Sequence, residues 1–147
     1  MRKLEFDLSK AKADLDYTPC KGQVVLVIRS ENGVCFVRRS GDRGWSFPSD
    51  RIGQTEDVGK STKRVAKDQC GVMLSRVELA GIYDVIWHYS DVSIKRLHFV
   101  YAAMTDDHKC SPSKDSGISE ARFFKETPHG VQDDEIQRLA LADCSAK

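Results

Sequence analysis

The sequence predicts an α+β domain built in layers, and two local patterns carry this prediction. Runs rich in β-branched and aromatic residues at 23–29 and 34–39 flank Asn32-Gly33, a dipeptide that is a strong β-hairpin signal. In residues 58–69 the less polar side chains recur at steps of three and four, which is the spacing of a helix with one buried face. Gly71 follows where the left-handed residue of a helix C-terminus is expected.

Further elements are predicted along the chain in the same way. The first residues alternate charged and apolar side chains, which predicts an edge strand, and residues 9–15 are expected to form a short helical turn. Two long strands are expected at 76–89 and 94–104, and a short strand at 121–125. An acidic first turn, placed at the positive end of a helix dipole, predicts a final helix at 131–144.

Composition places the chain among ordinary globular proteins of one domain. It has 147 residues, of which 40% are hydrophobic and 31% are charged, as is typical of a folded domain with a real core. The net charge of +1 provides no broad field for nucleic acid or an anionic membrane, so neither partner is expected. No apolar run approaches the length of a membrane span, and a cytoplasmic location is the default expectation.

The cysteines and histidines do not indicate a metal centre or a redox motif. The cysteines are odd in number and widely spaced, with no C-x-x-C pair, so free thiols in a reducing compartment are expected. The histidines likewise lack metal-ligand spacing. The residues concerned are Cys20, Cys35, Cys70, Cys110 and Cys144, with His88, His98, His108 and His129.

Residues 45–72 form the motif around which the chain is organised. They read WSFPSDRIGQTEDVGKSTKRVAKDQCGV, and they resemble the Nudix box, G-x5-E-x7-R-E-U-x-E-E-x-G-U, in which U is aliphatic. Aligned on Gly71, the box takes Glu56 as its first glutamate and Arg64 as its arginine. The residues that further match the box or its W-x-aliphatic-P lead-in are Trp45, Phe47, Pro48, Ala66 and Val72.

The resemblance implies both a fold and an activity. It implies α/β/α layers with a mixed β-sheet between helices, in which residues 20–147 form a single Nudix-like domain and residues 1–19 a separate N-terminal segment. The implied activity is the Mg²⁺- or Mn²⁺-dependent hydrolysis of nucleoside diphosphates linked to another moiety. The implied partner is a small phosphorylated ligand, a nucleotide derivative, and an oligomer is left open.

Four departures from the box bear on that activity. Asp50 replaces the opening glycine, Val65 replaces the glutamate after the arginine, and Asp68-Gln69 replaces the pair of glutamates. Mg²⁺ takes oxygen ligands in near-octahedral geometry, and carboxylates at i and i+4 of a helix can share one cation. Valine cannot ligate a metal, and a glutamine oxygen brings no net charge. An eroded metal site with weak or altered hydrolysis is therefore predicted; the alternative is a non-catalytic module that binds a nucleotide or another ligand.

Asp68 and Glu56 are the remaining candidate metal ligands, and each has a structural alternative. Glu56 and Arg64 are expected to tie the loop to the helix by a charge-assisted hydrogen bond, so that Glu56, Arg64 and Gly71 form the scaffold of the box. Asp68 is also spaced for a helix ion pair with Arg64. In an active protein, acids in the loops would supply the missing ligands, and the candidates are Asp50, Asp57 and Asp115.

Arg39 and Trp87 are the candidate contacts to the ligand. The resemblance places Arg39 at the end of a strand where some members contact phosphate or base, and the alternative is a solvated charge. Trp87 offers an aromatic face to a base, with rim packing as the alternative. His98 lies in an apolar strand and is predicted to be structural. A histidine base, as in the GDP-mannose hydrolases, is a remote third hypothesis, because residues 115–124 contain no histidine.

Overall fold

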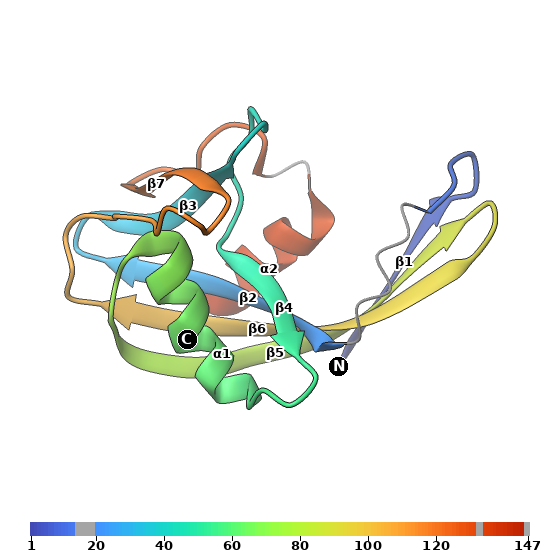
Figure 1. Ribbon diagram of the computed structural model, residues 1–147, viewed down its shortest axis with the longest axis horizontal. Coiled ribbons are helices and arrows are strands. Elements are labelled where there is room, and N and C mark those ends of the chain that lie inside the picture. Colours follow the sequence, from blue (N-terminus) through green and yellow to red (C-terminus); the bar gives the residue numbers. More distant parts are fainter. Residues whose placement is uncertain (14–19, 132–133, 146–147) are drawn as a thin grey trace.

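The computed structural model describes residues 1–13, 20–131 and 134–145. Its strands form one mixed sheet in the order β1-β5-β6-β2-β3-β7, with β4 paired to β2, and helices cover both faces (Figure 1). None of the helices in these ranges has the length and apolar character to cross a membrane. The elements are β1 (Arg2–Leu8), β2 (Cys20–Ser30), β3 (Gly33–Arg39), β4 (Ser49–Gly53), α1 (Val58–Val65), η1 (Ala66–Cys70), β5 (Leu74–Tyr89), β6 (Ser93–Thr105), β7 (Ile118–Phe124) and α2 (Glu135–Ser145). The α+β prediction is confirmed.

Strand β2 lies in the middle of the sheet, and its position explains its apolar sequence. Residues 24–28 are all buried, because β2 pairs with β3, β4 and β6 within the sheet while helices cover both of its faces. Alternate side chains enter different cores: Val24 and Leu26 pack on the side of α1, and Val25 and Val27 pack on the side of α2. A strand buried on both faces loses the polar alternation of a strand that faces water.

The helix expected at 58–69 is present, but its winding changes before it ends. Asp57 caps α1 by accepting a hydrogen bond from the Lys60 amide at 3.0 Å. The chain then continues into the π-helical segment η1, and Gly71 ends it in a left-handed conformation with a φ of 67°. A Cβ atom at Gly71 would also lie 2.0 Å from the carbonyl oxygen of Ser111. Glycine is therefore required there for both conformation and space.

Strand β1 forms the predicted edge of the sheet, but the helical turn expected after it is wrong in its described part. β1 pairs in parallel with the last half of β5. Residues 9–11 then form a tight turn in which the Ala11 amide donates to the Leu8 carbonyl at 2.9 Å, and the Ser90 amide donates to the Ala11 carbonyl at 2.9 Å. This tie to the β5–β6 hairpin holds the turn against the sheet; positions 14 and 15 lie outside the described residues.

Strand β4 is the element that the sequence did not predict. It covers five residues between the Trp45 segment and α1, and only Ile52 among its side chains is fully buried. One apolar residue in five gives neither an alternating nor a continuous hydrophobic pattern. The strand forms because it pairs antiparallel with the first half of β2, a long-range contact that leaves no local signal. As a result, the loop of the box follows directly from a strand of the sheet.

The cysteines are free thiols, as predicted, and three of them meet between the sheet and the box helix. The sulfur of Cys35 on β3 lies 3.3 Å from that of Cys70 at the end of η1 and 3.7 Å from that of Cys110. Cys35 and Cys70 are buried in the core on the side of α1, where they act as small apolar side chains.

Candidate functional site

Arg64 joins the loop of the box to its helix. Its Nε and Nη2 donate to the two carboxylate oxygens of Glu56 at 2.7 and 3.1 Å, and its Nη1 donates to Asp50 at 2.8 Å. Glu56 also accepts a hydrogen bond from the Gly53 amide at 3.0 Å. The hydrogen bond from Arg64 lowers the pKa of Glu56, and the Glu56 carboxylate raises the pKa of Arg64. The half-buried guanidinium of Arg64 and its two carboxylate partners therefore hold the turn between β4 and α1 in place.

The loop acids considered as replacement metal ligands are engaged elsewhere or lie in the open. Asp50 forms the ion pair with Arg64 at 2.8 Å. Asp57 accepts from the backbone at the start of α1, and a capping carboxylate has one oxygen already directed at the helix. Asp115 is exposed in the loop before β7. The structure therefore does not gather these three side chains at one place.

Asp68 lies half-buried at the π-helical end of the box helix. The ion pair expected between it and Arg64 is replaced by the pairs from Arg64 to Glu56 and Asp50, which occupy the guanidinium. The Asp68 carbonyl accepts a hydrogen bond from the Ser113 amide at 2.8 Å, so the loop before β7 is anchored here. Over the described residues, no group of three or more His, Cys, Asp or Glu side chains has an arrangement that could hold a metal ion.

Gln69 bonds to both backbone polar groups of one residue, Ser49. The side chain is only 4% exposed; its Nε2 donates to the Ser49 carbonyl at 2.7 Å, and its Oε1 accepts from the Ser49 amide at 3.2 Å. Arg39 donates to the same carbonyl at 2.8 Å and to the Ser49 hydroxyl at 3.1 Å. Two donors, one of them cationic, therefore converge on one backbone oxygen where β4 begins.

Val65 faces the core and not the solvent. It has no exposed surface, and it packs among the apolar residues between α1 and the sheet, which include Val24 and Ile52. The two helix positions four residues apart, Val65 and Gln69, do lie on one face, as their spacing predicts. That face is turned inward, towards β2 and β4.

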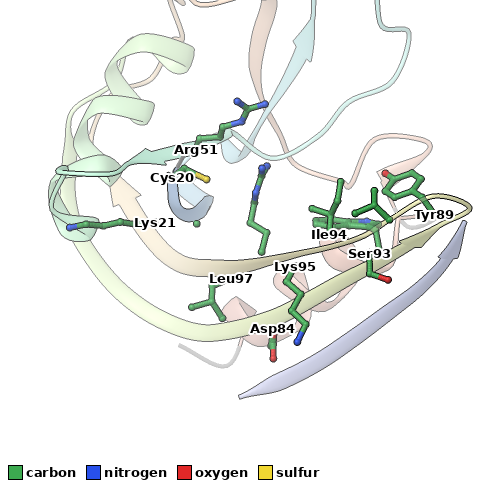
Figure 2. Close-up of a pocket in the computed structure, with 13 residues that line it drawn as sticks. Cys20, Lys21, Arg51, Asp84, Tyr89, Ser93, Ile94, Lys95 and Leu97 are labelled. Atoms are coloured by element: carbon green, nitrogen blue, oxygen red, sulfur yellow. The ribbon is translucent and has the colours of Figure 1, made fainter. Parts of the chain in front are cut away.

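A cleft of about 800 Å³ lies beside the box, between the β5–β6 hairpin, the start of β2 and the end of β4 (Figure 2). Strand pairing sets Trp87 opposite Ile94 and Val85 opposite Arg96, which places Trp87 and Arg96 on one face of the hairpin. Figure 2 shows the labelled side chains of Lys95 and Leu97 directed away from Arg51. Arg51, Arg96 and Trp87 thus face a common space, with Lys21 at its margin.

The cleft is connected to the box through the backbone of Arg51. The Nη2 of Arg64 donates to the Arg51 carbonyl at 2.8 Å, and Arg51 lies in β4 opposite Gln23 of β2. The guanidinium of Arg51 is therefore carried by a strand that is fixed on both sides. A cationic group placed by rigid backbone is suited to bind an anionic oxygen without a large loss of conformational entropy.

Trp87 belongs to an aromatic row that also includes Phe6 and His98. Its ring centroid lies 6.4 Å from that of Phe6 in a stacked arrangement and 5.7 Å from that of His98. Burial lowers the pKa of His98, and its Nδ1 lies 3.3 Å from the Arg96 carbonyl. Trp87 therefore both packs at the rim and lines the cleft. Arg39 is not among the described residues that line the cleft.

Sequence reasoning missed the cationic side chains of the cleft. Arg51 stands next to Asp50 inside the motif, and Arg96 lies in a strand that was predicted, but the pattern does not show that they meet. The register of the β5–β6 hairpin would have found Arg96, because the pairing of Trp87 with Ile94 places Arg96, two residues further along β6, on the same face. The placement of Arg51 depends on β4, and no local sequence pattern predicts that strand.

No model of a known protein family matches the sequence, and no curated protein matches it either. Solved structures do resemble the fold. A mutant form of the Bacillus subtilis pyrophosphohydrolase BsRppH is 17% identical, with a TM-score of 0.68 over 95% of this chain and 89% of that one. A MutT NUDIX hydrolase from Burkholderia pseudomallei is 16% identical, with a TM-score of 0.65 over 85% of this chain and 98% of that one.

A third similar structure is the NUDIX domain of Shewanella oneidensis NrtR in complex with ADP ribose. It is 15% identical, with a TM-score of 0.58 over 76% of this chain and 78% of that domain. The likeness to these structures extends over most of the chain. The chain therefore has the Nudix fold.

Proposed function

We propose that this chain binds a phosphorylated small molecule, a nucleotide derivative, in the cleft beside the box, and that it hydrolyses this ligand weakly or not at all. The observation that carries the proposal is the pair of hydrogen bonds between the Gln69 side chain and the backbone N–H and C=O of Ser49. They use the Gln69 side chain to hold β4 to the box helix. Position 69, where the box has a glutamate, is therefore occupied by a side chain that stabilises the scaffold of a binding site.

The residues present do not fit a resident divalent cation. Mg²⁺ requires several oxygen ligands at about 2.1 Å with near-ideal octahedral geometry. Val65 is closed off in the core, the amide of Gln69 is committed to Ser49, and Glu56 shares its charge with Arg64. Arg39 adds a cationic donor on the Ser49 carbonyl. Asp68 and Glu56 remain the only metal ligands that we propose, and they do not form a complete set.

The cleft has the chemistry to bind a nucleotide derivative. Guanidinium groups bind phosphate oxygens with paired hydrogen bonds, and Arg51 and Arg96 present two of them from different strands. An aromatic ring gives a base a flat surface, and Trp87 lies at the same end of the hairpin. The ADP ribose bound to the NUDIX domain of NrtR supports a ligand of this class. We propose Arg51, Arg96 and Lys21 as phosphate contacts and Trp87 as the base contact. Arg39, which does not line the cleft, is proposed as a phosphate contact only for a ligand that extends beyond it.

Thermal unfolding with and without ligand tests this proposal. A ligand that binds only the folded state stabilises it by about 2.7 kcal/mol at one hundred times its Kd. We expect ADP-ribose or a nucleoside di- or triphosphate to raise the melting temperature in the presence of EDTA. Arg51→Ala and Trp87→Ala should each remove most of the shift, whereas Arg138→Ala, an exposed arginine of α2, should leave it unchanged. A panel without any stabilising ligand would contradict the proposal.

The second candidate function is weak hydrolysis that depends on Mg²⁺ or Mn²⁺. Its support is that Glu56 and Asp68 both lie on the box and both keep part of their surface open to solvent. Product release with Mg²⁺ or Mn²⁺ that is lost in Asp68→Asn but retained in Asp115→Asn would favour it. Wild-type turnover of roughly 1 to 1000 per second, which is ordinary for an enzyme, would exclude the non-catalytic module.

A further inference from the structure

Among the described residues, no strand lies beside the outer edge of β5 along its first half. β1 pairs with β5 only over residues 83–89, whereas β6 pairs with nearly all of β5 on the other side. In Figure 1, β1 runs beside the far end of the β5–β6 hairpin, and the other end of β5 is the outermost strand of the sheet. Within the described ranges, the backbone at 75–79 therefore directs hydrogen-bonding groups outward with no strand to receive them.

Apolar side chains are exposed around this edge. Met73 is 82% exposed, Met104 48%, Leu79 43% and Val77 36%. These four account for most of the large exposed hydrophobic side chains of the described residues. Val77 and Leu79 share one face of this edge, and Met104 lies on the other; neighbouring exposed apolar side chains of this kind mark an interaction surface more often than scattered ones do. Residues 75–79 also contain no lysine or proline, the residues that commonly keep an edge strand from pairing.

The sequence of this edge is complementary to itself in an antiparallel arrangement. When two copies of 75–79 are paired about Val77, Arg76 of each copy lies opposite Glu78 of the other, and Val77 lies opposite Val77. Pairing centred on Arg76 or on Glu78 would instead place like charges opposite each other, which is unfavourable. Arg76 and Glu78 have exposed side chains and are only 3.8 Å from each other within the strand, a weak surface pair. Both are available to a partner.

The two faces of such a pairing would be chemically distinct. Val77 and Leu79 lie opposite Ala103 and Tyr101 of β6 and thus share the face that α1 covers further along the sheet. Arg76 lies opposite Met104, on the other face. The pairing would bury the two Val77 side chains on one face and set two ion pairs on the other. Alternation of this kind fixes the register, because a slip by one residue would exchange the two faces.

We propose that two copies of this chain associate through antiparallel pairing of β5 at 75–79, which continues the sheet across a two-fold axis. Each copy uses the same surface in such an interface, so the assembly closes at a dimer and does not extend into a filament. The proposal does not depend on the ligand or on hydrolysis, because the edge lies apart from the residues that line the cleft.

Sedimentation of charge variants tests the dimer. We expect the wild type to associate as its concentration is raised towards about 1 mM. Arg76→Glu and Glu78→Arg should each place like charges opposite each other twice and raise the dissociation constant by at least about tenfold. The double variant Arg76→Glu/Glu78→Arg has opposite charges facing each other again and should recover the wild-type constant. Arg138→Glu makes the same change of charge on α2 and should have no effect.

Hydrogen exchange of the wild-type protein provides a test without any substitution. The amides at 75–79 that point away from β6 should be protected in concentrated samples and exchange faster on dilution, while amides of β2 should not change. A protein that stays monomeric over this concentration range overturns the proposal. A dimer whose dissociation constant is unchanged by both charge reversals also overturns the proposal, because its interface would then lie elsewhere.

Discussion

Gln69 and Ser49 lie twenty residues apart and exchange two hydrogen bonds, one from the Gln69 side chain to the Ser49 carbonyl at 2.7 Å and one from the Ser49 amide to the Gln69 side chain at 3.2 Å. A carboxamide can make this pair because it carries a donor and an acceptor on one planar group. A carboxylate cannot, since it only accepts. The substitution that weakens the box as a metal site is therefore the one that permits this link.

Gln69→Glu should destabilise the domain by about 1–3 kcal/mol, because it leaves the buried Ser49 carbonyl facing a carboxylate in place of a donor. Chemical denaturation at neutral pH measures the change. Lys67→Glu is the matched control: Lys67 is exposed two residues before Gln69 in the same helical segment, and surface changes usually stay within about 0.5 kcal/mol. Equal stabilities of Gln69→Glu and the wild type would show that the two hydrogen bonds contribute nothing net.

Val65→Glu should unfold the domain or lower its free energy of unfolding by several kcal/mol, because a carboxylate would replace a side chain with no exposed surface. Val65→Ala separates the loss of packing from the cost of charge and should be the milder variant. Rebuilding both carboxylates in Val65→Glu/Gln69→Glu is therefore not expected to produce a hydrolase. A folded double variant with new Mg²⁺-dependent turnover would show that this helix face can open to solvent.

Glu56→Ala and Arg64→Ala should each destabilise the protein, and the double variant should cost less than the sum of the two. The coupling energy is expected at roughly 1–2 kcal/mol, since the pair is bidentate and half-buried. Arg64→Ala should be the costlier change, because Arg64 also binds Asp50 and the Arg51 carbonyl. Glu135 and Arg138, an exposed pair at 3.9 Å, provide a control cycle with coupling below about 0.5 kcal/mol. Strict additivity at Glu56 and Arg64 would mean that the two side chains do not meet in solution.

The stability of the protein should fall in acid in two steps. His98 has a lowered pKa because of its burial, so the unfolded chain takes up this proton first and stability declines as the pH falls below about 6.5. Glu56 has a pKa lowered by Arg64; its contribution is complete above about 4.5 and is lost as the pH falls through the lower folded value. Glu56→Gln should flatten only the second step in pH-dependent denaturation.

Local patterns in the sequence predicted most of the fold. Asn32-Gly33 placed the first hairpin, and Gly71 marked the end of the box helix, because both depend on the backbone freedom of one residue. β4 escaped prediction because it forms through pairing with β2, and the π-helical winding of η1 has no composition of its own. Solved structures with the same fold support the family resemblance that the box suggested.

The candidate site could be predicted only in part, for the same physical reason. Spacing alone indicated that Val65 and Gln69 share one face of the helix, but not that this face is closed by β2 and β4. Trp87 was identified by its chemistry. Arg51 and Arg96 were not, because their meeting depends on how β4 and the β5–β6 hairpin are placed in three dimensions. Arg39 stays a prediction, and so does Asp68, which the Asp68→Asn variant tests.

The parallel pairing of β1 with β5 has a consequence for how the chain is made. Arg2 lies beside Tyr83, so during synthesis β1 must wait for a partner made roughly eighty residues later, and such distant contacts slow folding. β2 waits in the same way for β6. Because β1 lies at the edge of the sheet and pairs with β5 alone, we expect it to dock after β5 and β6 have paired.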